Sequence, residues 1–124
     1  MSCCSDKMES FNPESCCTPT ETVQQASIAM RRTGCGCSPV LKNKDDRTVV
    51  GVVTEHDVSQ KIVADDRKAS ETAVQEIMSP ASACCGHDDS LESVRRKLHE
   101  HKATSLPVVD RAGSCCGTIS VHHC

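Results

Sequence analysis

The sequence has 124 residues, a net charge of −3 and a single aromatic residue, Phe11. This length fits one compact domain, and the lack of a basic cluster or of aromatic rings for base stacking argues against a nucleic-acid partner. No apolar run approaches the ~20 residues that span a bilayer, and the first residues lack a signal peptide's apolar segment, so we expect a cytoplasmic protein with no membrane partner.

Eleven cysteines are unusually many for this length. Most of them form adjacent pairs: Cys3-Cys4, Cys16-Cys17, Cys84-Cys85 and Cys115-Cys116. The count is odd and no secretory signal is visible, so we do not expect a disulfide framework.

Two segments of the chain align without a gap at an offset of 68 residues. "CCTPTETVQQASIAMRRTGCGCSPVL" at 16–41 lies over "CCGHDDSLESVRRKLHEHKATSLPVV" at 84–109. The match extends to "ESFNP" with "EIMSP", at 9–13 and 76–80, and to "GVVT" with "GTIS", at 51–54 and 117–120. Internal repetition indicates two copies of one structural unit. We therefore predict a flexible tail over 1–8, repeats over 9–65 and 76–124, and a linker over 66–75, with the two repeats forming one globular module.

Each unit begins with a short apolar piece that contains a Cys pair, and a helix follows. Apolar residues recur at helical spacing in both copies: Val23, Ala26 and Met30, then Leu91, Val94 and Leu98. Thr22 with Gln25 has the form of a capping box, and Ser90 holds the same place in the second copy. Thr18 with Glu21 offers a competing helix start.

Strands follow each helix. A strand that contains a Pro-Val pair is predicted at 39–42 and at 106–109, and each is followed by a polar turn. A second, β-branched strand is predicted at 48–54 and at 115–121. In the first copy, Val58 and Ile62 begin a further helix at about 57–65. Each unit is therefore β-α-β-β-α, and the fold class is α+β.

The order and double occurrence of these motifs resemble the cystathionine β-synthase (CBS) domain pair. The motifs that carry the resemblance are "EIMSP", the helix pattern T-V-x-x-A-x-x-x-M, the Pro-Val strand and "GVVTEHD". The resemblance covers about residues 9 to 124. It implies two repeats packed about a pseudo-twofold axis with a cleft on each side, a homodimer, and a regulatory module that modulates a partner protein. It also implies an adenine ligand: AMP, ADP, ATP or S-adenosylmethionine, with no cofactor required.

By this resemblance, Thr54 and Asp57 are the principal ligand contacts. The Thr54 hydroxyl can donate to a phosphate at the start of a helix, and the Asp57 carboxylate can accept from ribose hydroxyls. Gly51 permits a close backbone approach or a bend, and the backbone of Cys37 and Ser38 resembles the adenine-edge contact. The alternative is that Thr54 and Asp57 only cap the helix.

The second copy departs from the pattern at two places. Ser120 keeps a hydroxyl at the Thr position, but His123 replaces the Asp and brings no fixed negative charge. The sequence also ends at Cys124, where the first copy continues into a helix. We therefore expect the second repeat to lack its final helix, and apolar sheet surface to be left exposed.

The cysteines admit two interpretations. In one they are small buried hydrophobes. In the other they form a metal- or thiol-responsive site, because strand alternation places Cys35 with Cys37, and His122 with Cys124, on shared faces, and thiolate and imidazole suit zinc or copper. This sensor hypothesis extends to Cys115, Cys116 and His123.

A structural dimerisation module without a ligand is the remaining alternative. Catalysis is not expected, because no nucleophile–base pair, paired carboxylates or phosphate-binding glycine loop is visible. The His56-Asp57 dipeptide lacks the further ligands of a metal-dependent hydrolase.

Overall fold

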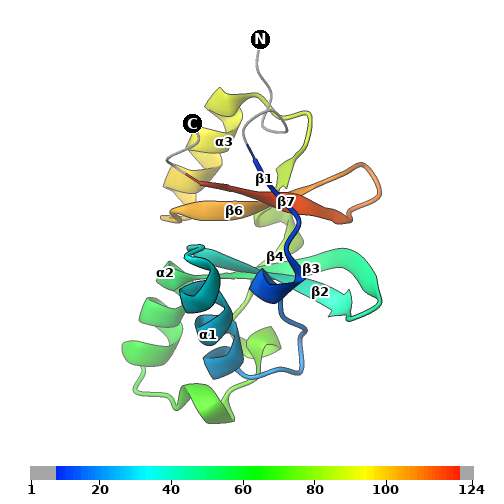
Figure 1. The fold of residues 1–124 in the computed structure, drawn as a ribbon. Helices are drawn as coiled ribbons and strands as arrows, with labels where there is room; N and C mark the ends of the chain where they lie inside the picture. The colour runs from blue at the N-terminus through cyan, green and yellow to red at the C-terminus, as the bar shows by residue number, and fades with distance from the viewer. Residues whose placement is uncertain (1–7, 121–124) are drawn as a thin grey trace.

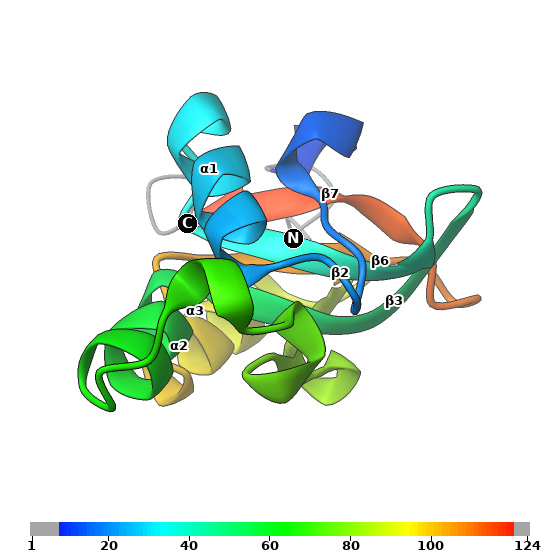
Figure 2. The same ribbon diagram turned by 90° about the horizontal axis from the view of Figure 1, so that it is seen from below.

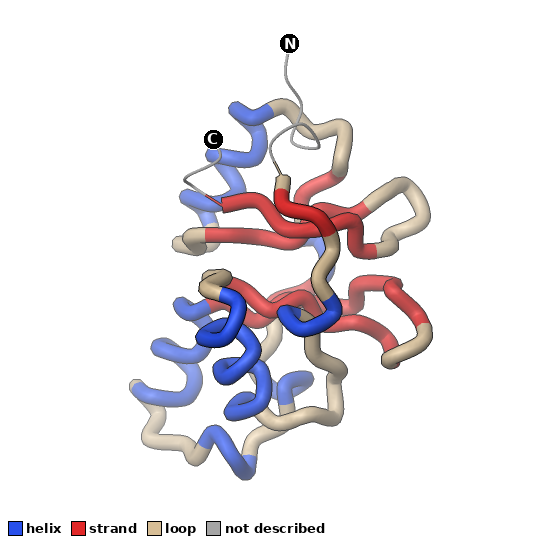
Figure 3. The backbone as a smooth tube through the Cα atoms, in the orientation of Figure 1, coloured by secondary structure: helices blue, strands red, loops and turns tan. Residues whose placement is uncertain are grey.

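The computed structural model describes residues 8–120 of the chain. Two lobes are stacked with their sheets facing each other, and α1, α2 and α3 lie on the outer sides (Figures 1 and 3). The predicted α+β class with two tandem repeats is confirmed. The elements in chain order are β1 (Glu9–Ser10), η2 (Pro13–Ser15), α1 (Val23–Thr33), β2 (Cys37–Asn43), β3 (Asp46–Thr54), α2 (Glu55–Val58), η3 (Ser59–Val63), η4 (Ala69–Glu71), η5 (Val74–Glu76), β4 (Ser79–Pro80), η6 (Ala81–Ala83), β5 (Cys85–Gly86), α3 (Leu91–Glu100), β6 (Ser105–Val109) and β7 (Cys115–Ser120).

Each repeat lends its opening strand to the sheet of the other repeat. One sheet has the order β2-β3-β4, and the other has the order β1-β7-β6-β5. Strand β4, from the start of the second repeat, pairs with β3, and β1, from the start of the first repeat, pairs with β7. Backbone hydrogen bonds therefore tie the two repeats together.

The segments "ESFNP" and "EIMSP", matched in the sequence, both provide the strand that crosses into the other sheet. Their residues do not occupy equivalent positions in these strands, however. Pro80 is the strand partner of Gly51, whereas Ser10, and not Pro13, is the partner of the equivalent Gly117. Pro13 instead begins η2, which Asn12 caps with its side chain. Pro13 therefore does not correspond to Pro80, because Asn12 and Pro13 form a capped turn that follows the strand.

The hairpin of β2 and β3 and the hairpin of β6 and β7 turn at the same end of the molecule (Figures 1 and 2). Thr48 of β3 forms an antiparallel bridge with Ser114, just before β7. The backbone N–H of Val49 donates to the carbonyl of Gly113 over 2.9 Å. The hairpin ends are therefore a second backbone link between the repeats.

The helices begin at the predicted caps. Thr22 Oγ1 accepts from the backbone N–H of Gln25 (3.1 Å), and Gln25 Oε1 accepts from the backbone N–H of Thr22 (2.8 Å). Thr18 and Glu21, the competing pair, close a separate turn just before the helix, with Thr18 N–H donating to Glu21 Oε1. Ser90 is the N-cap of α3, as predicted. Local side-chain bonds thus decide where both amphipathic helices start.

The helix predicted at about 57–65 begins at Glu55, two residues earlier. Its second half, η3, has π-helical geometry and buries Ile62 against the core of the first repeat. The predicted absence of a final helix in the second repeat concerns residues beyond Ser120, outside the described part of the chain. Within residues 8–120, no helix combines the length and the apolar content needed to cross a membrane.

The segment predicted as a linker, 66–75, is bonded to the start of α1. The backbone N–H of Val23 donates to the carbonyl of Thr72 (2.9 Å), and that of Val74 donates to the carbonyl of Glu21 (2.8 Å). Val74 is fully buried. The connection between the repeats therefore packs against the first repeat along part of its length.

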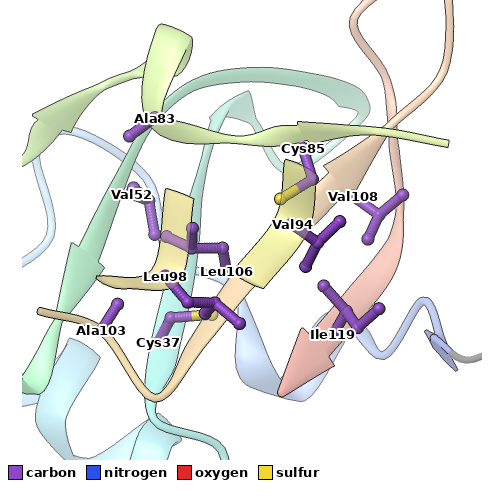
Figure 4. Close-up of a cluster of buried hydrophobic side chains, with 10 residues drawn as sticks. All are labelled: Cys37, Val52, Ala83, Cys85, Val94, Leu98, Ala103, Leu106, Val108 and Ile119. Carbon is purple, nitrogen blue, oxygen red and sulfur yellow. The ribbon is translucent and has the colours of Figure 1, made fainter. Parts of the chain in front are cut away.

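The apolar core continues from one repeat into the other (Figure 4). Cys37 and Val52 of the first repeat pack among buried side chains of the second repeat: Ala83, Cys85, Val94, Leu98, Ala103, Leu106, Val108 and Ile119. Full burial of one Val or Leu side chain contributes about 1.5–3 kcal/mol. Separating the repeats would lose part of this burial on both sides.

Candidate functional site

Thr54 and Asp57 form a reciprocal pair at the junction of β3 and α2. Thr54 Oγ1 accepts from the backbone N–H of Asp57, and Asp57 Oδ2 accepts from the backbone N–H of Thr54, both over 3.1 Å. Both residues are buried. The capping role predicted as the alternative is therefore confirmed. It leaves the Thr54 hydroxyl proton available as a donor, because the capping bond uses the oxygen only as an acceptor.

The Asp57 carboxylate also binds two side chains that the sequence interpretation missed. Lys61 Nζ lies 3.1 Å from Oδ1, and Ser79 Oγ lies 3.1 Å from both carboxylate oxygens. Lys61 is four residues beyond Asp57, which is the spacing of a helical ion pair and was a usable signal. Ser79 carries no such signal, because only the exchange of β4 brings it to this place.

Lys61 connects this carboxylate to the start of the exchanged strand. Its ammonium also donates to the carbonyl of Ile77 over 2.8 Å. These bonds use two of the three donors of an ammonium group, and the side chain is 44% exposed. The junction thus combines a hydroxyl, a carboxylate and a half-exposed ammonium within one small cluster.

Gly51 is required by the close approach of β4. A Cβ atom at this position would lie 2.7 Å from Met78 Sδ and 2.7 Å from the carbonyl oxygen of Ser79. The predicted close backbone approach is therefore confirmed: the backbone of Ser79 and the side chain of Met78 come up against Gly51. Gly51 thereby allows Ser79 to reach Asp57. A ligand role for Gly51 stays a prediction.

Cys37 and Ser38 lie beside Thr54 but are completely buried. Cys37 is the cross-strand partner of Thr54, and Ser38 is the partner of Val53. The Ser38 hydroxyl donates to the carbonyl of Ser15 over 2.8 Å. Their side chains are thus occupied in the core, and a ligand role for their backbone stays a prediction.

In the second repeat, Ser120 lines a hollow of about 250 Å³ between the repeats. His123, predicted at the Asp position, lies outside the described residues. The other residues that line this hollow are Glu9, Gly34, Cys35, Gly36, Glu55, Thr104, Ser105 and Thr118. The structure therefore places the Ser120 region next to the loop that carries Cys35.

Cys35 and Cys37 share a face, as predicted, with their sulfur atoms 3.9 Å apart. His122 and Cys124, the other two candidate metal ligands, lie outside the described residues. In the part of the chain that the structure describes, no group of three or more His, Cys, Asp or Glu residues converges to hold a metal ion. Only half of the predicted ligand set can therefore be placed.

Most of the described cysteines are buried, in line with the first interpretation: Cys17, Cys37, Cys84, Cys85 and Cys115. Burial raises the pKa of Cys17 to about 11 and the pKa of Cys84 to about 12. Cys84 and Cys85 belong to different core clusters, so adjacent thiols do face opposite sides. These sulfurs serve as small apolar groups in the core.

Cys16 is half-buried and interacts with Cys115 of the second repeat. A hydrogen bond between the two side chains lowers the pKa of Cys16 and raises the pKa of Cys115. This contact adds a side-chain link between the repeats to the two backbone links.

The sequence matches the family model of the CBS domain twice, over residues 11–64 and 74–124. It is 33% identical over 104 residues to homoserine O-acetyltransferase of Methanosphaera stadtmanae. It is 31% identical over 105 residues to inosine-5'-monophosphate dehydrogenase of Streptococcus pyogenes. Each match covers 84% of this chain and 20% of the relative, so the chain spans about a fifth of the length of these enzymes.

Solved structures share the fold over nearly the whole chain. Hypoxic Response Protein I, crystallised with two coordinated zinc ions, has a TM-score of 0.79 at 20% identity, covering 98% of this chain and 95% of that chain. CBSX2 from Arabidopsis thaliana has a TM-score of 0.76 at 24% identity, covering 98% and 89%. CBSX2 in complex with AMP has a TM-score of 0.74 at 23% identity, covering 99% and 92%.

Proposed function

The chain belongs to the CBS-domain family, and from this premise we propose that it is a regulatory module that binds an adenine nucleotide or S-adenosylmethionine where Thr54 meets Asp57. The observation that carries the proposal is the cluster of Thr54, Asp57, Lys61 and Ser79. A hydroxyl and a half-exposed ammonium suit a phosphate, and a carboxylate suits ribose hydroxyls. The complex of the related CBSX2 with AMP supports the ligand class.

Ligand binding at this junction would compete with bonds inside the protein. Ser79 and Lys61 hold the carboxylate of Asp57, so a ribose hydroxyl that binds it would share this acceptor with them or replace the bond from Ser79. Ser79 lies on β4, at the start of the second repeat. Replacement of its bond would therefore change how firmly the second repeat is held to the first. A ligand that binds more tightly when the bond between Ser79 and Asp57 is broken would favour that arrangement of the repeats. A partner that distinguishes the two arrangements would then respond to the ligand.

The hollow beside Ser120 is the weaker candidate. Its volume of about 250 Å³ falls below the ~300–1,000 Å³ of most small-molecule pockets. In the sequence, His123 also stands where the first repeat has Asp57, so the second repeat lacks the carboxylate for ribose hydroxyls, and we propose one principal ligand site, in the first repeat.

The test is isothermal calorimetry of the purified full chain with AMP, ADP, ATP and S-adenosylmethionine. Absorbance near 260 nm would first reveal any bound nucleotide, because the chain has no Trp or Tyr. We expect one ligand to bind, and Thr54→Ala to abolish the binding. Thr22→Ala is the matched control, because it removes the same kind of helix cap away from the site and is expected to bind normally.

A structural dimerisation module is the second candidate. It is favoured by the Asp57 carboxylate, whose oxygens are already bound by groups of the protein. In this case the folded, nucleotide-free protein would bind none of the four ligands and would still dimerise. We propose a cytoplasmic homodimer that modulates a partner protein under either interpretation, and light scattering during size-exclusion chromatography tests the dimer.

A further inference from the structure

Cys35 and Cys37 lie in the short connection between α1 and β2. The helix ends at Gly34, whose φ of 70° lies in the left-handed region that favours glycine. The backbone then bends at Gly36, and β2 begins at Cys37. The two sulfur atoms are 3.9 Å apart across this bend. The pair thus lies at a bend of the backbone, and not along a regular strand.

The two thiols differ in their access to solvent. Cys35 is half-buried and lines two hollows, one of about 390 Å³ beside Met30 and Val58 and the other of about 250 Å³ beside Ser120. Cys37 is fully buried, and its side chain packs in the core between the repeats (Figure 4). A reagent from solvent therefore reaches Cys35 first, while Cys37 is held behind it.

We propose that Cys35 and Cys37 form a reversible disulfide when a hydroperoxide oxidises Cys35. The Cys35 thiolate attacks the peroxide, the O–O bond breaks, the leaving oxygen departs as water or an alcohol, and Cys35 becomes a sulfenic acid. The Cys37 sulfur then attacks the Cys35 sulfur, and the S–O bond breaks. The hydroxide leaves as water with the Cys37 proton. Two electrons pass from the two thiols to the peroxide, and an external dithiol reverses the reaction.

The geometry requires only a small closure. A disulfide bond is about 2.05 Å long, so the sulfurs must approach each other by roughly 1.9 Å. Two extended residues span at most about 7 Å, and the bend at Gly36 brings the two ends closer, towards the usual Cα separation of a disulfide, about 5.5–6 Å. Gly36 itself is packed closely, since a Cβ there would collide with the hydroxyl of Thr104, so the sulfurs approach each other mainly by rotation of the two cysteine side chains. The closure is therefore a local change in one short connection.

The electrostatic environment favours Cys35 as the attacking thiol. A hydrogen bond with Cys37, together with the hydroxyl of Ser105 3.5 Å away, lowers the pKa of Cys35 to about 5. The same bond and its burial raise the pKa of Cys37. Thiolates are the reactive form of cysteine, so this environment favours the thiolate at the half-buried Cys35, while the buried Cys37 keeps its proton.

Closure would alter two links around the connection. Cys35 Sγ contacts Ser105 Oγ of β6 in the second repeat, and this contact would be lost as the sulfur turns to Cys37. The carbonyl of Gly36 accepts from the backbone N–H of Glu55, the first residue of α2, over 3.2 Å. Oxidation would therefore change a contact between the repeats and a hydrogen bond next to Thr54. The disulfide itself does not depend on nucleotide binding.

The test is mass spectrometry of the full chain after titration with hydrogen peroxide, alkylation and trypsin. Cleavage after Arg32 and Lys42 yields a peptide of residues 33–42 in which Cys35 and Cys37 are the only cysteines. At low peroxide we expect this peptide to lose the mass of two hydrogens, and dithiothreitol to restore it. In Cys37→Ala we expect a sulfenic acid at Cys35 that dimedone traps.

Cys116→Ser is the matched control, because Cys116 is also half-buried but has a raised pKa. It should leave the disulfide unchanged, and in the natural sequence Cys35 should react with iodoacetamide at pH 6 about tenfold faster than Cys116 or more. The proposal is overturned if the first disulfide joins another pair, such as Cys16 and Cys115. It is equally overturned if residues 33–42 keep both thiols while others oxidise. These readouts use the natural sequence, so they decide the matter even if Cys37→Ala does not fold.

Discussion

Replacing Gly51 with alanine tests whether the strand exchange depends on a residue without a side chain. The added methyl would lie 2.7 Å from Met78 Sδ and from the carbonyl oxygen of Ser79. The methionine side chain can turn away. The carbonyl belongs to β4, whose backbone is paired with β3, so it can move only if the strand moves.

The expected cost follows from these two contacts. Overpacking of this kind costs about 1–3 kcal/mol, and the loss of glycine flexibility returns about 0.5–1 kcal/mol. We therefore expect the free energy of unfolding to fall by about 0.5–2 kcal/mol, out of the roughly 5–15 kcal/mol typical of a domain. Urea unfolding followed by circular dichroism measures it, because the chain has no Trp or Tyr for fluorescence.

Two further variants separate the causes. Met78→Ala in the Gly51→Ala background removes the sulfur contact but not the carbonyl contact, so most of the loss should persist. Gly113→Ala adds a methyl with nothing within 4 Å and loses about 1–2 kcal/mol to left-handed strain at its φ of 83°. Gly51 does not have a positive φ, so its loss must come from the contacts of the added methyl. An unfolding free energy of Gly51→Ala equal to or above that of the natural sequence would refute the reasoning.

Lys61→Met should lower the free energy of unfolding by about 0.5–1.5 kcal/mol, because the buried Asp57 carboxylate loses a charged donor. In the same urea assay, Lys68→Met, which breaks the exposed ion pair with Glu71 at 3.9 Å, should have no measurable effect, and equal losses would contradict the role of Lys61. Stability should also fall as the pH rises above about 9, because the unfolded chain ionises thiols that the folded protein keeps neutral. The stability that comes from keeping these thiols neutral is fully present below the pKa of the unfolded chain. As the pH rises, each thiol loses about 1.4 kcal/mol of it per pH unit. The loss ends at about pH 11 for Cys17 and at about pH 12 for Cys84, which are their pKa values in the folded protein. Thermal unfolding from pH 7 to 11 should show a flatter decline for Cys17→Ala than for the natural sequence, and parallel declines would contradict it.

The repeated unit and its local signals could be predicted from the sequence alone. The helix starts at Thr22 and Ser90, and the cap of Thr54 with Asp57, depend on residues three apart, and helical geometry brings such residues together wherever the chain folds. The prediction that Cys35 and Cys37 share a face holds as well, although they meet across a bend at Gly36 and not by alternation along a strand. These features need no knowledge of distant contacts.

Only the tertiary structure decided which distant residues complete the site. Ser79 reaches Asp57 because β4 crosses into the sheet of the other repeat, and no local pattern records that exchange. The match of "ESFNP" with "EIMSP" likewise did not give the pairing of β1 with β7, since hydrogen bonds between segments more than 100 residues apart depend on the packing of both sheets. Ser105 likewise meets Cys35 only through the stacking of the two repeats. Contacts between residues a few positions apart can thus be predicted from the sequence, whereas the distant partners of Asp57 and Cys35 depend on how the two repeats pack together.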